Sequence, residues 1–178
     1  MTVVTVWVCK ICGEAYISTT EKPARCPFCG AYEKYLVDSK DYDDTGAWDV
    51  ELNETDKTNV EKALGVEISN TLFYKCSAKK VKEIDGQKLF KILSKVEMEH
   101  ASVWKKILKL DKIKWEPAET CEVDYEADLK DSHARETRAI KFYGEAAAAA
   151  KTPRVKEIFE AFIEVETDHL KLSQQRLK

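Results

Sequence analysis

Apolar side chains recur at helical spacing in four long stretches of the chain, which indicates four amphipathic helices. We predict these helices at about 56–82, 86–110, 124–151 and 153–177. The first carries an apolar stripe with a spacing of four residues, formed by Val60, Leu64, Ile68 and Leu72. The second has apolar residues near the same period: Leu89, Phe90, Leu93, Val96, Val103, Ile107 and Leu110. The opening residues, up to Val8, are instead predicted to form a β-strand.

The helical region consists of two copies of one unit. A shift of 69 residues, without any insertion, places eight residues of the first copy on identical residues of the second. They are Glu67, Phe73, Tyr74, Ala78, Phe90, Val96, Glu97 and His100, which correspond to Glu136, Phe142, Tyr143, Ala147, Phe159, Val165, Glu166 and His169. Each copy is therefore predicted to be a pair of antiparallel helices. Turns are expected near residues 82 and 151, where Asp85-Gly86 and Thr152-Pro153 supply turn and helix-start signals.

In each copy a carboxylate and an imidazole lie three residues apart, as in Glu97 and His100. On a helix that spacing puts both groups on one face. When the two helices of each copy pair about the predicted turn, Glu67 comes to the level of Glu97 and His100. Glu136 comes to the level of Glu166 and His169 in the same way. The expected cluster consists of Glu67, Glu97, His100, Glu136, Glu166 and His169.

A cluster of four carboxylates in a core is costly to bury unless the groups are protonated, paired or bound to metal. Any one of these glutamates alone would more simply lie on a solvated helix face, and a single histidine would be an ordinary core residue. The duplication at matched levels favours a two-metal site between four helices. Mixed carboxylate and imidazole ligands suit iron or manganese.

Two Cys-x-x-Cys knuckles lie near the start of the chain, Cys9 with Cys12 and Cys26 with Cys29. Two residues between thiolates let both sulfurs reach one tetrahedral ion, and a glycine after each knuckle permits a positive φ. The spacing predicts a four-thiolate metal site. It leaves open whether the ion is a structural zinc or an iron that carries one electron.

The chain is thus predicted to comprise a metal module at residues 1–37, a linker at 38–58 and a helical bundle at 59–178. Two more cysteines, Cys76 and Cys121, lie outside the knuckles. We predict a small core residue at the first position and an inert loop thiol at the second.

Composition and charge exclude several classes of function. The net charge is −3 with acidic and basic residues intermixed, so we expect neither a nucleic-acid surface nor a membrane surface. No apolar run approaches membrane-spanning length, and the start lacks the basic and apolar segments of a secretory signal. Metal binding explains the six cysteines better than disulfides do, which favours a cytoplasmic location.

The knuckles, the paired helices and both Glu-x-x-His motifs together resemble the rubrerythrin family, in the arrangement that places the rubredoxin-type module first. The resemblance covers nearly the whole chain. It implies an all-α, ferritin-like four-helix bundle preceded by a small rubredoxin-like β module. It also implies that an iron–tetrathiolate centre passes electrons to a non-haem di-iron site, which reduces hydrogen peroxide to water in protection against oxidative stress. The six clustered residues would be the iron ligands.

The same resemblance implies that Tyr74 and Tyr143 donate hydrogen bonds beside the iron ligands; ordinary aromatic core is the alternative. This chain has Ala139, and Asn70 at the matching place of the repeat, where many rubrerythrins carry an additional glutamate on the third helix. A di-iron oxidase or ferroxidase therefore stands as an alternative to the peroxidase. A non-catalytic protein with a zinc ribbon and a relic bundle is a second alternative.

The sequence also predicts partners. No glycine-rich nucleotide fingerprint is present, so oxidation of NAD(P)H is assigned to a separate reductase, with a rubredoxin as another possible donor. A module at the end of the bundle would lie roughly 22 Å of helix from the di-iron site. We therefore predict a head-to-tail homodimer. The connection at 111–123 is long enough for a crossover or for exchange of helix pairs between chains.

Overall fold

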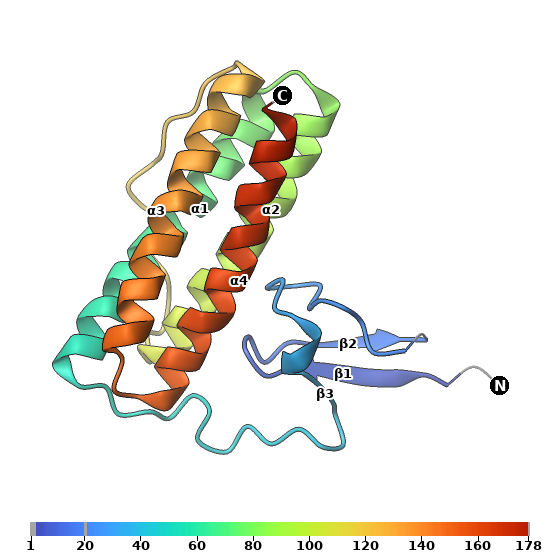
Figure 1. Ribbon diagram of the computed structural model, residues 1–178, viewed down its shortest axis with the longest axis vertical. Coiled ribbons are helices and arrows are strands. Elements are labelled where there is room, and N and C mark those ends of the chain that lie inside the picture. The colour runs from blue at the N-terminus through green and yellow to red at the C-terminus, as the bar shows by residue number, and fades with distance from the viewer. Residues whose placement is uncertain (1–2, 20, 178) are drawn as a thin grey trace.

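The computed structural model describes residues 3–19 and 21–177, and it consists of a four-helix bundle with a small β module against its side (Figure 1). The helices are α1 (Glu54–Lys80), α2 (Ile84–Ile107), α3 (Tyr125–Ala149) and α4 (Pro153–Arg176). The predicted fold class is confirmed. No described helix is long and apolar enough to cross a membrane.

The helix ends lie within three residues of the predicted ones and have local causes. Asn53 and Asp124 cap α1 and α3, each accepting a hydrogen bond from a backbone N–H of the first turn. Proline begins α4 as predicted. The role given to Gly86 is wrong, because this residue lies inside the first turn of α2. A Cβ there would meet the ring of Tyr125 at 2.8 Å, so glycine permits close packing rather than a turn.

The two helix pairs are joined by a crossover. The chain leaves α2 at one end of the bundle and returns along its side to begin α3 at the other end (Figure 1). The helices α2 and α3 consequently run in the same direction, while α1 with α2 and α3 with α4 form antiparallel hairpins. Within this single chain residues 111–123 follow the crossover, while exchange of helix pairs between chains stays a prediction.

Asp56 ties the turn between α3 and α4 to the start of α1. Its buried carboxylate accepts hydrogen bonds from the backbone N–H groups of Lys151 (3.1 Å) and Thr152 (2.8 Å) and from the side-chain amide of Asn53 (2.7 Å). Burial opposes ionisation, but these hydrogen bonds dominate and hold the pKa of Asp56 below its ordinary value.

We expect the Asp56→Asn substitution to lower the free energy of unfolding by about 2 kcal/mol near neutral pH, since hydrogen bonds to a charged group contribute about 1.5–3 kcal/mol. Because the folded-state pKa is depressed, this contribution is present above the ordinary aspartate pKa and is lost as the pH falls through the folded-state value. Denaturant titrations of both proteins at several pH values measure the difference. A difference that did not shrink in acid would contradict the assignment.

The N-terminal module is a three-stranded antiparallel sheet with the order β2-β1-β3. Its strands are β1 (Thr5–Cys9), β2 (Ala15–Ser18) and β3 (Leu36–Asp38), and a short 3-10 turn, η1 (Glu33–Tyr35), precedes the last strand. The predicted opening strand is thus present from Thr5, and the first two residues of that prediction lie outside the described residues. The two knuckles occupy the loops that follow β1 and precede η1.

The module docks along the side of α2 and α4, not at the end of the bundle. Lys106 of α2 donates to the carbonyl of Cys12 (2.7 Å), and Arg154 of α4 donates to the carbonyl of Lys10 (2.7 Å). Further along α4, Asp168 pairs with Arg25 of the module. The expected distant position of the module is therefore wrong, because these side chains hold it beside the bundle. The geometric reason for a head-to-tail dimer disappears, and the homodimer itself stays a prediction.

Cys76 of α1 and Cys121 of the crossover form a disulfide, with Cα atoms 5.9 Å apart. The predictions of an unpaired core cysteine and an inert loop thiol are both wrong. The residues are 45 positions apart, and only the path of the crossover along α1 brings them together. Since this pair is oxidised, the cysteines no longer argue uniformly for a reducing compartment, and the cytoplasmic location stays a prediction.

Candidate metal centres

The four knuckle cysteines form one buried cluster. The Sγ atoms of Cys9 and Cys29 are 3.7 Å apart, as are those of Cys12 and Cys26. Four sulfurs at about 2.3 Å from a tetrahedral ion would be about 3.8 Å from one another. The arrangement of the sulfurs therefore fits a single tetrahedral metal ion and is too open for disulfides.

The four sulfur atoms also share protons. A hydrogen bond from the Cys12 thiol is the main cause that lowers the pKa of Cys9 and of Cys26. The pKa of Cys12 and of Cys29 is raised, chiefly by hydrogen bonds within the same cluster. Ionisation is thus easier at Cys9 and Cys26 than at the other two cysteines. A bound cation would favour ionisation of all four.

A glycine follows each knuckle, at Gly13 and Gly30, with φ of +81° and +75°. Their N–H groups donate to the carbonyls of Cys9 (2.8 Å) and Cys26 (3.1 Å), which closes the two knuckle turns. Gly30 has a second function, because a Cβ at this position would lie 2.9 Å from Cγ1 of Val165 on α4. Glycine at this place therefore also allows the module to pack closely against the bundle.

The four helices each contribute carboxylate or imidazole groups to a second cluster, buried in the bundle core. It contains two overlapping sets of four residues, and within each set one ligand atom per residue lies within 4.8 Å of the others. The sets are Glu67, Glu97, His100, Glu166 and Glu97, Glu136, Glu166, His169. All six residues singled out in the sequence are brought together. Glu97 and Glu166 belong to both sets, so each of them could contribute an oxygen to either candidate ion.

Both histidines direct Nδ1 into this cluster. His100 Nδ1 lies 3.0 Å from Glu166 Oε1 and 3.5 Å from Glu97 Oε2. His169 Nδ1 lies 3.0 Å from Glu97 Oε1 and 2.8 Å from Glu166 Oε2. The His100 ring also stacks on Phe162, with ring centroids 4.0 Å apart, which fixes its orientation. The internal repeat thus gives the cluster an approximate two-fold symmetry.

The protons of the cluster are distributed unequally. Burial and the charge of a neighbouring carboxylate raise the pKa of Glu67 and of Glu136 well above the ordinary value. Burial opposes ionisation of Glu97 too, but hydrogen bonds from the histidines lower its pKa. The carboxylates in turn raise the pKa of both imidazoles against the effect of burial. Metal binding would therefore displace protons, because imidazole and carboxylate bind metal in their deprotonated forms.

The cluster also contains buried polar atoms that are not satisfied by a well-aligned protein hydrogen bond. They are Glu67 Oε2, both carboxylate oxygens of Glu97, Glu136 Oε2, Glu166 Oε1 and His100 Nδ1; histidine nitrogens lie close to several of them, but none of these atoms makes a hydrogen bond of good geometry. Unpartnered buried carboxylate oxygens are costly in a folded core, and cations are their natural partners. The donor set of oxygen and imidazole nitrogen therefore fits two metal ions. Which ions these are, and that all six residues bind them, stay predictions.

Two buried tyrosines hydrogen-bond to the cluster across the bundle. The Tyr74 hydroxyl donates to Glu136 and also lies 3.0 Å from Ser132 Oγ, while the Tyr143 hydroxyl donates to Glu67. Each tyrosine thus supports the glutamate of the other repeat. Burial and the adjacent carboxylate raise the pKa of both tyrosines, so they remain protonated donors. The crossing could not be inferred from spacing along one helix, because it depends on how α1 packs against α3.

One hydrogen bond joins the two candidate metal centres. Nε2 of His100 lies 2.9 Å from the carbonyl oxygen of Cys29, and both residues are fully buried. The carbonyl can only accept, so Nε2 donates and Nδ1 is left for the bundle cluster. The thiolate cluster and the carboxylate cluster are therefore linked within one chain through a single imidazole.

Three other polar residues of the bundle lie outside both centres. Asp168 accepts a hydrogen bond from Tyr32 of the module (3.2 Å) and so serves docking. Glu99 is half-buried, and burial raises its pKa. Among the described residues, neither four-residue set includes His133, whose Nδ1 lies 3.4 Å from Ser173 Oγ.

Asn70 and Ala139, the two positions at which the sequence departs from the resemblance described above, both line a cavity of about 460 Å³ between α1 and α3. Both are buried, and the Nδ2 atom of Asn70 has no hydrogen-bond partner.

Comparisons of this chain with protein-family models, with curated proteins and with solved structures found no match. What can be said of its chemistry therefore comes from its own residues. They form a four-cysteine group that could hold one metal ion and a buried glutamate–histidine group that could hold two.

Proposed function

We propose that this protein is a non-haem di-iron peroxidase, similar to the rubrerythrins, that reduces hydrogen peroxide to water. The observation that carries the proposal is the hydrogen bond from His100 to the carbonyl of Cys29, which connects a candidate one-electron site to a candidate two-metal site. Reduction of one peroxide molecule to two water molecules consumes two electrons and two protons. Two redox-active irons supply the electron pair when bound, and the tetrathiolate iron supplies replacement electrons.

The residues of the chain would hold and move protons in this reaction. Glu67 and Glu136 have raised pKa values and accept hydrogen bonds from Tyr143 and Tyr74, so each carboxylate is paired with a protonated phenol. These tyrosines orient the carboxylates and are the nearest protein proton donors to them. The surrounding apolar core, which includes Phe162, excludes bulk water from the reacting atoms.

The oxidant and the donor are part of the proposal. Hydrogen peroxide is proposed as the substrate, and dioxygen is the competing oxidant. A separate NAD(P)H-dependent reductase or a rubredoxin is proposed to reduce the tetrathiolate iron. A homodimer remains a proposal for the assembly, with exchanged helix pairs as one form of it, although the electron route described here is complete in one chain.

A ferroxidase is the second candidate, and the bundle site alone would suffice for it. A ferroxidase would have no need for a four-cysteine module that contacts His100 of the bundle site. The peroxidase uses that contact, and we therefore prefer it. A non-catalytic protein with zinc in the thiolate site requires no metal in the bundle. The unpartnered buried carboxylate oxygens argue against that reading.

The proposed function predicts the behaviour of protein purified without oxygen. We expect red protein that contains one iron in the thiolate site and two in the bundle, and whose reduced form is reoxidised faster by hydrogen peroxide than by air. Metal analysis and visible absorption before and after each oxidant measure this. Colourless protein with a single zinc ion would refute the proposal, and reoxidation faster by air would favour the oxidase.

A variant separates the two centres in this experiment. Cys26→Ser should remove the red colour while it leaves the bundle irons in place. After chemical reduction this variant is expected to consume peroxide once, but to sustain no turnover with a reductase. Sustained turnover at the wild-type rate would show that electrons bypass the thiolate site.

A further inference from the structure

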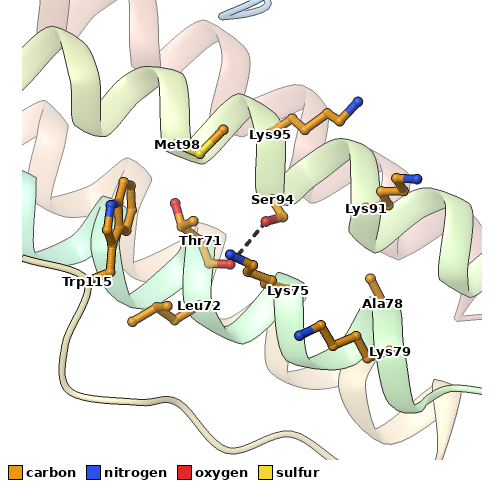
Figure 2. Close-up of a pocket in the computed structure, with 10 residues that line it drawn as sticks. All are labelled: Thr71, Leu72, Lys75, Ala78, Lys79, Lys91, Ser94, Lys95, Met98 and Trp115. Carbon is orange, nitrogen blue, oxygen red and sulfur yellow. Dashed lines mark hydrogen bonds between the residues drawn. The ribbon is translucent and has the colours of Figure 1, made fainter. Parts of the chain in front are cut away.

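A groove of about 480 Å³ lies on the outer surface of the bundle, between α1 and α2 (Figure 2). Leu72, Ala78 and Met98 give it an apolar lining, and the indole of Trp115 from the crossover stands at one end. This volume lies within the range of about 300–1,000 Å³ that small-molecule sites occupy. We call it the lysine groove, after the four lysines that line it: Lys75, Lys79, Lys91 and Lys95.

The four lysines make the groove strongly cationic. Lys75 and Lys79 lie one turn apart on α1, as Lys91 and Lys95 do on α2, so two rows of lysines line the groove. In the part of the chain that the structure describes, no carboxylate pairs with any of them, while lysines elsewhere on the bundle do form ion pairs. Four unpaired cations around one hollow repel one another, and an anion bound there would relieve that repulsion.

A buried hydroxyl also lines the groove. Thr71 is 3 % exposed, and its Oγ1 has no hydrogen-bond partner. Its backbone carbonyl, by contrast, accepts a hydrogen bond from Ser94 (3.2 Å). In Figure 2 the Thr71 hydroxyl points toward the end of the groove where Trp115 and Met98 lie. An unsatisfied hydroxyl beside an aromatic face suits a ligand with a polar ring.

We propose that the lysine groove binds a nucleoside phosphate, with its base against Trp115 and its phosphates between the lysine rows. The eight residue steps from Thr71 to Lys79 span roughly 12 Å of helix, which matches a base, a sugar and a short phosphate chain. The groove is too short for an acidic helix of a protein partner to lie along it. A fatty acid would leave the Thr71 hydroxyl unsatisfied. The proposal does not depend on the chemistry of the metal centres.

Calorimetric titration of the metal-loaded protein with ADP, and with adenosine and pyrophosphate as its two halves, tests this. We expect ADP to bind at least tenfold more tightly than either half, because stacking and charge act together. Metal content measured after each titration verifies that the phosphates have not removed the bound ions. ADP that binds no more tightly than pyrophosphate would overturn the proposal and show general attraction of anions only.

Variants locate the binding. Lys75→Gln/Lys95→Gln should weaken both ADP and pyrophosphate at least tenfold, whereas Trp115→Leu should weaken ADP about as much and leave pyrophosphate unchanged. The control Lys57→Gln/Lys141→Gln removes the same charge from exposed positions outside the groove and should change neither affinity more than twofold. All these positions are exposed, and circular dichroism checks their folding. An equal loss of ADP affinity in the control variant would overturn the proposal. A polyglutamate peptide that displaces ADP and binds more tightly than ADP would also overturn it.

Discussion

The Glu97→Ala variant is expected to lose both metal ions of the bundle. Glu97 belongs to both four-residue sets, and neither of its carboxylate oxygens makes a hydrogen bond of good geometry, so in the proposed two-metal site its removal would take a ligand from each ion. Loss of groups that only orient a ligand already weakens metal binding about 10–100-fold, and loss of a shared ligand should exceed about 100-fold. Metal analysis after anaerobic dialysis against limiting iron or manganese measures the change.

Two further variants make the test specific. Glu136→Ala removes a residue that belongs to one set only, so one ion should remain. Glu99→Ala removes a half-buried carboxylate two residues from Glu97 that belongs to neither set, and metal content should not change. If Glu97→Ala retained two ions, or lost no more than Glu136→Ala, the shared position of Glu97 would be disproved.

Removal of the Cys76–Cys121 disulfide is expected to destabilise the fold by about 4 kcal/mol, the chain-entropy estimate for a crosslink across 45 residues. For a chain of this size that corresponds to a fall in melting temperature of about 8–16 °C. The crosslink ties the crossover to α1, so its loss mainly frees residues 108–124. Thermal unfolding of Cys76→Ala/Cys121→Ala, with the metals bound, measures the effect.

Reduction supplies the control for this prediction. A mild reductant should lower the melting temperature of the wild type and leave that of the double variant unchanged, because the variant has no bridge to break. The knuckle cysteines are the same in both proteins, so any effect of the reductant on the four-cysteine site would appear in both. Equal sensitivity of both proteins to the reductant would mean that the loss comes from the metal site instead.

The sequence determined the helices and the buried cluster because these depend on periodicity. Matched residues such as Glu67 and Glu136 recur 69 positions apart, and antiparallel helices pair about their turn. The level of each glutamate in the bundle follows from that arithmetic. The four-thiolate cluster was likewise predictable, since two residues between cysteines allow both sulfurs to face one ion.

Features that join separate units could not be predicted in this way. The Tyr74 bond to Glu136 depends on how α1 packs against α3, and the Cys76–Cys121 bridge depends on the path of the crossover. Asp85-Gly86 predicted a turn, but Gly86 lies inside a helix, where its lack of a Cβ leaves room for the ring of Tyr125. In each case the deciding partner lies far away in sequence, where no local pattern records it.

The position of the module is the largest difference between expectation and structure. The sequence alone determined that a thiolate cluster and a carboxylate–imidazole cluster occur in one chain. Tertiary structure alone decided that they are neighbours, through side chains such as Lys106 and Arg154 that hold the module on the bundle. The physical reason is that docking depends on complementary surfaces formed only after each unit has folded. The link between His100 and Cys29 is a product of that docking.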